Sequence, residues 1–143
     1  MSSPPYGYRY GPRQIIAVEI DSSSSAIVAG DFLSVATAGY LQQASAGEIA
    51  VAVAVDSCAS PSADGGAVIR ADFSRDSVYE FPPDTGTVTQ ALKFASMDVG
   101  GPQSVDIDAS TDNALDCVDV DTTANTVFVQ LSKSTQLYTG VTQ

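Results

Sequence analysis

Residues 49–55 alternate between two kinds of side chain. Ile49, Val51, Val53 and Val55 are β-branched, and the residues between them are alanines. A period of two is that of a β-strand, and β-branched side chains favour extended backbone. One face of such a strand carries large apolar groups and the other only methyls, which suits a strand buried on both sides. We therefore predict a sheet with this segment in its interior.

The rest of the chain repeats the pattern in shorter runs. Residues that favour turns separate these runs, as at Asp64-Gly65-Gly66 and Pro82-Pro83. About eight to ten short strands with almost no helix predict an all-β fold, a single compact β-barrel or β-sandwich. Further strands are expected at residues 15–20, 40–41, 67–73, 78–81, 104–109, 115–121 and 125–131. Residues 26–36 are apolar around a turn at Ala29-Gly30-Asp31, and residues 87–95 suit either a strand or a short helical turn.

Length and composition set the domain organisation. With 143 residues, of which 44% are hydrophobic, the chain is expected to bury one core but not two. We predict an extended N-terminal attachment arm at residues 1–14, a β-barrel or β-sandwich domain at residues 15–131, and a polar C-terminal tail at residues 132–143.

The predicted arm differs in composition from the rest of the chain. Its three prolines and two glycines argue against a helix. In extended backbone Tyr6, Tyr8 and Tyr10 project to one side, with Arg9 and Arg13 on the other. Tyrosine and arginine contribute much of the binding energy at protein interfaces, so these five residues are the candidate partner-binding residues. A passive tail is the alternative. Deleting residues 2–14 tests the choice, because we expect a folded body to remain.

The charge of the chain restricts its partners. The net charge is −11, and residues 1–14 contribute +2, so the remaining residues carry −13. Nucleic acid is excluded as a direct partner because phosphate binding needs lysine and arginine, whereas attraction to a basic surface remains open. No apolar run approaches the roughly 20 residues of a membrane helix, and the N-terminus lacks the apolar core of a signal peptide. We expect synthesis in the cytoplasm and no membrane partner.

The residues needed for common catalytic chemistry are missing. The sequence has no histidine, which removes histidine-dependent nucleophilic sites, histidine metal ligands and the commonest general base. Its glycine pairs lack the spacing of phosphate-binding loops. Cys58 and Cys117 are too few for a disulfide framework and are not spaced for zinc, so free buried thiols are expected. We expect no enzymatic activity, no cofactor and no metal.

Aspartates are concentrated in one stretch of the chain, where they offer two interpretations. Oxygen-rich clusters suit calcium, but residues 106–117 lack the glycine and the glutamate of an EF-hand loop. Apolar and acidic residues alternate at 105–108 and 118–121, which favours solvated strand faces instead. A carboxylate-only hydrolase is a third, more distant possibility. The aspartates concerned are Asp98, Asp106, Asp108, Asp112, Asp116, Asp119 and Asp121.

The run AIVAGDFLSVATAGYLQQAS at residues 26–45, followed by IAVAVAV at residues 49–55, resembles the small capsid decoration, or cement, proteins of tailed bacteriophages. The resemblance extends over roughly residues 26–131 and includes VDIDASTDN at 105–113 and TTANTVFV at 122–129. It implies a β-rich protein that binds the outer surface of a mature head, often as a trimer, and bridges major capsid subunits without any chemistry. A virion-surface module that binds carbohydrate or host, with tyrosines stacking on sugars, is the alternative.

Overall fold

The computed structural model describes residues 6–37 and 39–133. Residues 1–5 of the predicted arm and 134–143 of the predicted tail lie outside the described residues. Within them the chain is all-β, as predicted, with eleven strands and one short 3-10 turn. The elements are β1 (Gly7–Tyr10), β2 (Ile15–Glu19), β3 (Phe32–Thr37), β4 (Tyr40–Gln43), β5 (Ala52–Ala54), β6 (Val68–Asp72), β7 (Val78–Phe81), η1 (Gln90–Leu92), β8 (Ser96–Gly101), β9 (Ser104–Asp106), β10 (Leu115–Asp121) and β11 (Thr126–Leu131).

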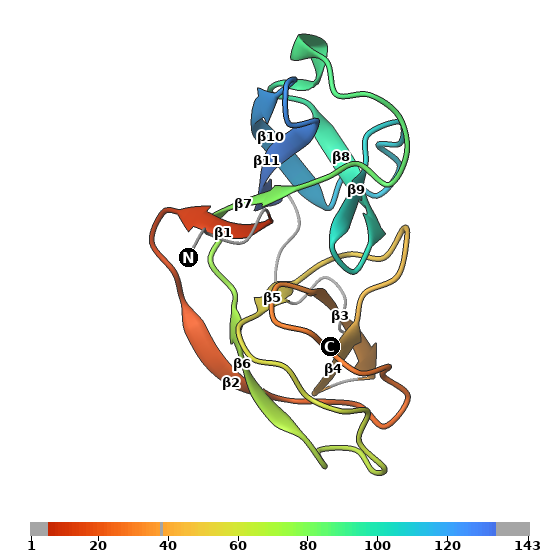
Figure 1. Ribbon diagram of the computed structural model, residues 1–143. Coiled ribbons are helices and arrows are strands. Elements are labelled where there is room, and N and C mark those ends of the chain that lie inside the picture. Colours follow the sequence, from red (N-terminus) through yellow and green to blue (C-terminus); the bar gives the residue numbers. More distant parts are fainter. Residues whose placement is uncertain (1–5, 38, 134–143) are drawn as a thin grey trace.

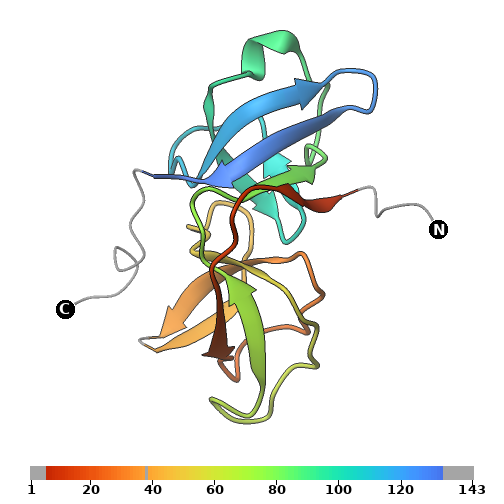
Figure 2. The same ribbon diagram turned by 90° about the vertical axis from the view of Figure 1, so that its left-hand side faces the viewer.

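The strands form two antiparallel sheets that occupy two lobes (Figure 1). The six-stranded sheet has the order β1-β7-β11-β10-β8-β9, and the five-stranded sheet has the order β2-β6-β5-β3-β4. The chain passes from the upper to the lower lobe between β1 and β2 and returns between β6 and β7. Figure 2 shows these two connections near the middle of the molecule, at the junction between the lobes.

The buried apolar side chains divide into two clusters, so the expectation of a single core was wrong. One cluster lies mainly on the six-stranded sheet and the other on the five-stranded sheet. Alternation along β3 explains the division, because Phe32 belongs to the first cluster and Leu33 to the second. The rings of Phe32 and Phe81 lie 4.7 Å apart between centroids and join the two lobes. Strand β3 therefore contributes side chains to both clusters, one from each of its faces.

Only the middle of the alternating segment at residues 49–55 forms the predicted interior strand. Its strand, β5, is the third of five in its sheet, between β6 and β3. Val53 is 1% exposed and belongs to the first cluster, whereas Ala52 and Ala54 face the second. The predicted division of the whole segment into a large face and a methyl face was wrong, because Val51 belongs to the second cluster and Ala50 to the first.

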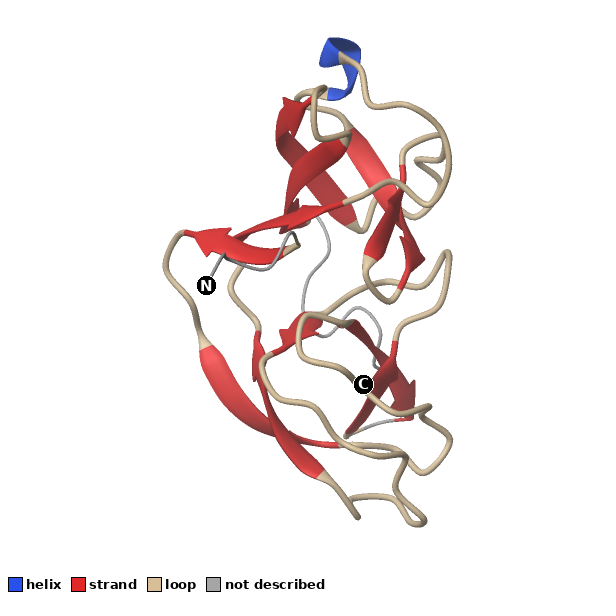
Figure 3. Ribbon diagram, viewed as in Figure 1, coloured by secondary structure: helices blue, strands red, loops and turns tan. Residues whose placement is uncertain are grey.

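Other strand predictions differ from the structure in detail. Residues 90–92 form the 3-10 turn η1, which agrees with the helical alternative for residues 87–95. Strand β8, with the sequence SMDVGG, was not predicted because its glycines and polar residues lack strand propensity. Isolated bridges at Ile20–Leu41 and Pro83–Val105 add contacts outside the named strands. The large fraction of strand and the near absence of helix are plain in Figure 3.

Candidate partner-binding surface

The N-terminal segment supplies the outer strand of both sheets. β1 pairs only with β7 in the six-stranded sheet, and β2 only with β6 in the five-stranded sheet. We call residues 6–19 the N-terminal edge. An outer strand presents unpaired backbone N–H and C=O groups to its surroundings. Just beyond β2 the bridge between Ile20 and Leu41 closes that end of the edge. The pairing side of β1 is therefore open, whereas that of β2 is partly closed by this bridge to the other outer strand of its sheet.

Exposed apolar side chains are concentrated on this edge. Eight large hydrophobic side chains are exposed among the described residues, and five of them belong to the N-terminal edge. They are Tyr6 (39% exposed), Tyr8 (36%), Tyr10 (54%), Ile15 (42%) and Ile16 (45%). Residues 6–18 also contain no aspartate or glutamate, although the chain has 17. The result is an apolar strip without acidic side chains on a strongly acidic protein, a combination that marks interaction sites.

Tyr8 is fixed by contacts within the protein. Its hydroxyl donates to the carbonyl oxygen of Gly11 at 2.6 Å. Its ring meets the ring of Tyr79 edge-on, with centroids 5.7 Å apart, and the guanidinium carbon of Arg13 lies 4.3 Å from the Tyr8 centroid. Aromatic and cation–π contacts of this kind are favourable and directional. Tyr8 therefore holds its neighbours in place as well as contributing exposed surface.

Both candidate arginines form internal ion pairs. Arg9 Nε lies 2.8 Å from Glu80 Oε1, and Arg13 Nε lies 3.3 Å from Asp72 Oδ2. Because Arg13 stacks on Tyr8, it does not lie on the side of the segment opposite the tyrosines, and this prediction was wrong. Opposite sides would follow from a straight extended segment, whereas the chain turns at Gly11 and Pro12. The N-terminal segment is consequently integrated into the β fold from Gly7 onward.

The turn depends on glycine at position 11. Gly11 has φ of +100°, and a Cβ atom built there would lie 2.3 Å from the carbonyl oxygen of Asp76. A side chain cannot be accommodated at that distance from backbone, and left-handed φ is itself unfavourable for other residues. The glycine thus lets the edge segment pass close against the return connection between β6 and β7.

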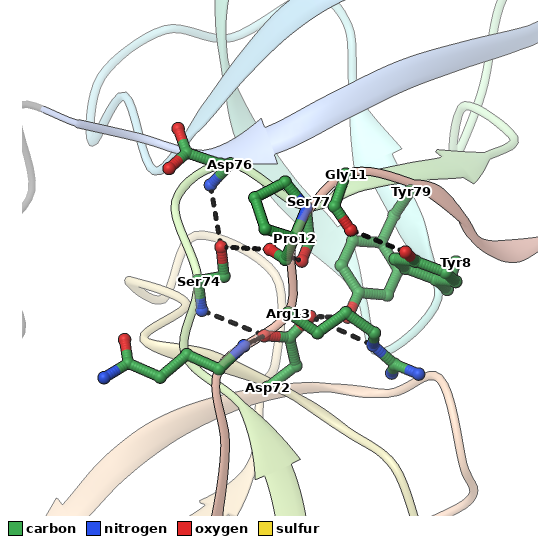
Figure 4. A network of polar contacts seen from close by, with 10 residues as sticks. Tyr8, Gly11, Pro12, Arg13, Asp72, Ser74, Asp76, Ser77 and Tyr79 are labelled. Atoms are coloured by element: carbon green, nitrogen blue, oxygen red, sulfur yellow. Dashed lines mark hydrogen bonds and ion pairs between the residues drawn. The ribbon is translucent and has the colours of Figure 1, made fainter.

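A buried carboxylate joins the two connections between the lobes, as Figure 4 shows. Asp72 is fully buried, and it accepts hydrogen bonds from the Tyr79 hydroxyl at 2.6 Å and from the backbone N–H groups of Gln14 at 2.9 Å and Ser74 at 3.0 Å. The Ser74 hydroxyl in turn donates to the carbonyl oxygen of Pro12 at 2.6 Å. The N-terminal edge is therefore held to the body by a connected polar network.

This network shifts the pKa values of its acidic members in opposite directions. Burial by itself raises the pKa of Asp72, but the hydrogen bonds from Tyr79, Gln14 and Ser74 outweigh burial, so the pKa of Asp72 is lowered. Burial and the hydrogen bond to Asp72 raise the pKa of Tyr79 above its ordinary value. Asp72 is thus ionised and Tyr79 neutral at pH 7, which suits a structural role for both.

A pocket of about 230 Å³ lies beside the edge. Tyr6, Tyr8, Arg13 and Tyr79 line it together with Gln103, which belongs to the turn between β8 and β9. The Gln103 amide donates to Asp31 Oδ1 at 2.8 Å and is thereby held at the rim. Aromatic faces with a few fixed polar groups are the usual lining of a small-ligand site.

Sequence reasoning located part of this surface. The five predicted residues are all on the edge, and the structure brings Tyr8 and Arg13 into contact while Tyr6 and Tyr10 stay exposed. Ile15 and Ile16 were assigned to a domain strand and missed as surface residues. Ile15 and Ile16 are consecutive, so one of them must face away from the core, a signal that the sequence did contain.

The acidic residues of the late stretch have structural partners. Asp98 is 4% exposed and accepts backbone hydrogen bonds from Thr111, Asp112 and Asn113 at 2.9–3.1 Å. Asp121 likewise accepts from the N–H groups of Thr123 and Ala124. Among residues 6–37 and 39–133, no three acidic or cysteine side chains are grouped as metal ligands. These carboxylates cap turns in the backbone.

The two cysteines are not bonded to each other. Cys117 is buried and Cys58 half-buried, and neither forms a disulfide. Burial raises the pKa of the Cys117 thiol, which keeps it protonated at neutral pH. The expectation of free buried thiols is confirmed for Cys117, whereas Cys58 is free but half-buried.

No protein-family model, no curated protein and no solved structure matches this chain. In the part of the chain that the structure describes, no helix has the length and apolar character needed to cross a membrane.

Proposed function

We propose that this protein is a non-enzymatic structural protein of a virion, a decoration or cement protein of a tailed bacteriophage. In this role it binds the outer surface of the head and stabilises the capsid by bridging major capsid subunits. The observation that carries the proposal is the N-terminal edge, which supplies an outer strand to two sheets, exposes aromatic side chains and has no acidic residue before Glu19. Neither enzymatic chemistry nor a cofactor is part of the proposal.

The mode of attachment follows from the pairing of β1. Because β1 already pairs with β7 on one side, its free side is available to a strand of the major capsid protein, which would extend the sheet. Tyr6 and Tyr10 supply side-chain contacts, together with Ile15 and Ile16. Tyr8, Arg9 and Arg13 belong to the same capsid-binding surface but act mainly by holding the edge in position through their internal contacts.

The acidic charge of the body supports a capsid protein as the partner, and several copies in one oligomer would strengthen the attachment. The strongly acidic body is attracted to basic surfaces and repels nucleic acid. A homo-oligomer, with a trimer favoured by the resemblance, would present several edges at once and so multiply a weak attachment. The proposed location is the outside of the capsid, after synthesis in the host cytoplasm.

We also propose that the β domain is a barrel rather than a sandwich. The bridge between Ile20 and Leu41 links the two outer strands of the five-stranded sheet, and the bridge between Pro83 and Val105 links the continuation of β7 to β9. Both favour sheets that curl in the manner of a barrel rather than lie flat as in a sandwich.

Co-sedimentation with undecorated phage heads tests the function. Deleting residues 2–14 is a poor test, since it would uncover β7 and remove the Arg13 and Gln14 partners of buried Asp72. We therefore choose Tyr10→Ser and Ile16→Ser as edge variants. Val28→Ser is the control, because Val28 is 55% exposed but lies outside the edge.

We expect the wild-type protein to bind heads saturably, at a fixed ratio to capsid subunits. The two edge variants should bind at least roughly tenfold more weakly, as aromatic and aliphatic anchors do when truncated, and Val28→Ser should bind as the wild type. Equal binding by all four proteins would contradict attachment through the edge. No binding by any of them would contradict the decoration function.

The pocket beside the edge favours carbohydrate binding as a second candidate function. The exposed ring of Tyr6 can stack on a sugar there, and the Gln103 amide at the rim can hydrogen-bond to it. Binding of defined glycans on an array, lost in Tyr6→Ala, would favour this host-binding function. Head binding without glycan binding would favour decoration.

A further inference from the structure

Phe94 combines exposure with an unusual backbone conformation. It is 80% exposed, more than any other large hydrophobic side chain among the described residues. Its φ is +74°, and the other two non-glycine residues with positive φ in the described part of the chain are Asn113 and Asn125. Asparagine tolerates this conformation, whereas a bulky aromatic residue rarely adopts it. Neither packing nor backbone preference accounts for phenylalanine here.

The backbone around Phe94 is firmly held. The Phe94 N–H donates to the carbonyl oxygen of Cys117 at 2.9 Å, and the Cys117 N–H donates to the carbonyl oxygen of Ala95 at 2.9 Å. Leu92 and Ala95, on either side, pack against the core of the six-stranded sheet. The exposed ring is therefore presented in a fixed direction, which lowers the entropy cost of binding.

Phe94 lies far from the N-terminal edge in the fold. It follows η1, which forms the end of the upper lobe that points away from the lower lobe in both views (Figures 1 and 2). The edge, by contrast, runs from the junction between the lobes down along the five-stranded sheet. We call residues 93–96 together with Asp119 the Phe94 tip.

Opposite charges accompany the ring. Lys93 Nζ lies 5.4 Å from the Phe94 centroid and 3.5 Å from Asp119 Oδ1. The Lys93 and Asp119 side chains are 32% and 52% exposed, so both remain accessible to a partner. A surface with an exposed aromatic ring, a cation and an anion is complementary to a second copy of itself, since the lysine of one copy can meet the aspartate of the next.

We propose that the Phe94 tip is a contact between copies of this chain. Phe94 of one copy packs on the tip of its neighbour, with Lys93 of one copy facing Asp119 of the next. With 17 acidic and six basic residues, most faces of two copies repel each other, whereas the tip carries a compensating cation. The inference concerns contact between copies and does not depend on attachment of the N-terminal edge to a shell.

Sedimentation equilibrium of the purified full chain over a wide concentration range tests the proposal. The wild-type mass should rise above that of a monomer with concentration, and Phe94→Gly should weaken association at least roughly tenfold. At concentrations at which the wild type is monomeric, the melting temperature of Phe94→Gly should be unchanged or higher, because glycine suits positive φ. Tyr10→Ser, on the edge, is the control and should associate as the wild type does.

A charge exchange shows whether the contact is intermolecular. Lys93→Asp and Asp119→Lys should each associate more weakly than the wild type, but an equimolar mixture of the two should associate more strongly than either alone. A wild-type protein that stays monomeric overturns the proposal. Association of Phe94→Gly equal to that of the wild type overturns it as well. A mixture of the two charge variants that associates no more strongly than either variant alone also overturns it.

Discussion

The N-terminal edge and the Phe94 tip both expose aromatic side chains, but the two regions hold them in different ways. On the edge, Tyr8 is fixed by side-chain contacts to Tyr79 and Arg13, which in turn depend on buried Asp72. At the tip, Phe94 is fixed through its backbone alone and its ring packs on little besides Lys93. Truncating the Tyr8 side chain should therefore affect stability, whereas truncating the Phe94 side chain should not.

The largest expected effect comes from Asp72→Asn. The variant loses the ion pair with Arg13 and leaves the N–H groups of Gln14 and Ser74 with a weaker acceptor. Breaking a buried pair in this way costs about 3 kcal/mol. Chemical denaturation should show this loss in the free energy of unfolding at pH 7.

The same pair of proteins gives a pH test. Because the pKa of Asp72 is lowered from its ordinary value of 3.8, its stabilising contribution is present above that pH and is lost as the pH falls through the folded-state pKa. The difference in stability between wild type and Asp72→Asn should therefore shrink below pH 3.8. A difference that is constant down to pH 2 would show that the Asp72 charge is not stabilising.

Gly11→Ala should have the next largest effect. The added methyl would lie 2.3 Å from the Asp76 carbonyl oxygen in a backbone with positive φ, and we expect a loss of about 2 kcal/mol or more. Gly7→Ala is the matched control, since Gly7 also has positive φ but nothing within 4 Å of the new Cβ. Denaturation midpoints that fall equally in both variants would mean that the close approach is unimportant.

Tyr8→Ala and Phe94→Ala compare the two regions directly. Tyr8→Ala loses two ring contacts and the hydrogen bond to Gly11, which together stabilise the fold by about 1–2 kcal/mol. Phe94→Ala should leave the free energy of unfolding unchanged within about 0.5 kcal/mol. Equal losses in calorimetric melting would contradict the distinction between edge and tip.

The smallest effect is expected for the exposed ion pair between Arg70 and Asp56, which lies outside both the N-terminal edge and the Phe94 tip. The side-chain hydrogen bonds from Arg70 lower the pKa of Asp56 to about 2. In Arg70→Gln the pKa of Asp56 should rise toward 3.8 while the melting temperature hardly changes, because exposed ion pairs stabilise little. NMR titration of the Asp56 carboxyl measures its pKa in the wild type and in Arg70→Gln. An unchanged pKa would refute the assignment of the shift to Arg70.

The sequence predicted the class of fold through local patterns. Alternation at residues 49–55 placed β5 in the middle of a sheet, and turn residues bounded most of the other strands. It did not predict β8, whose polar residues and glycines carry no strand signal, or the division into two cores. The division depends on β3 and β5 packing on both faces, a tertiary property that a single strand pattern does not specify.

The candidate site was predicted by composition rather than by geometry. Tyrosine and arginine enrichment identified the segment, but the partners of its arginines, Glu80 and Asp72, are distant in sequence. Nothing local predicts a pairing of β1 with β7 across about seventy residues. Phe94 was missed for a different reason, since its exposure and positive φ are properties of the folded chain.

The most direct test of the central proposal, that the N-terminal edge binds the partner, is hydrogen exchange of the full-length protein with and without undecorated phage heads. The account predicts new protection of backbone amides within residues 6–18 on binding, while β3 and β4 exchange as in the free protein. Protection of β3 and β4 with no change in residues 6–18 would contradict it.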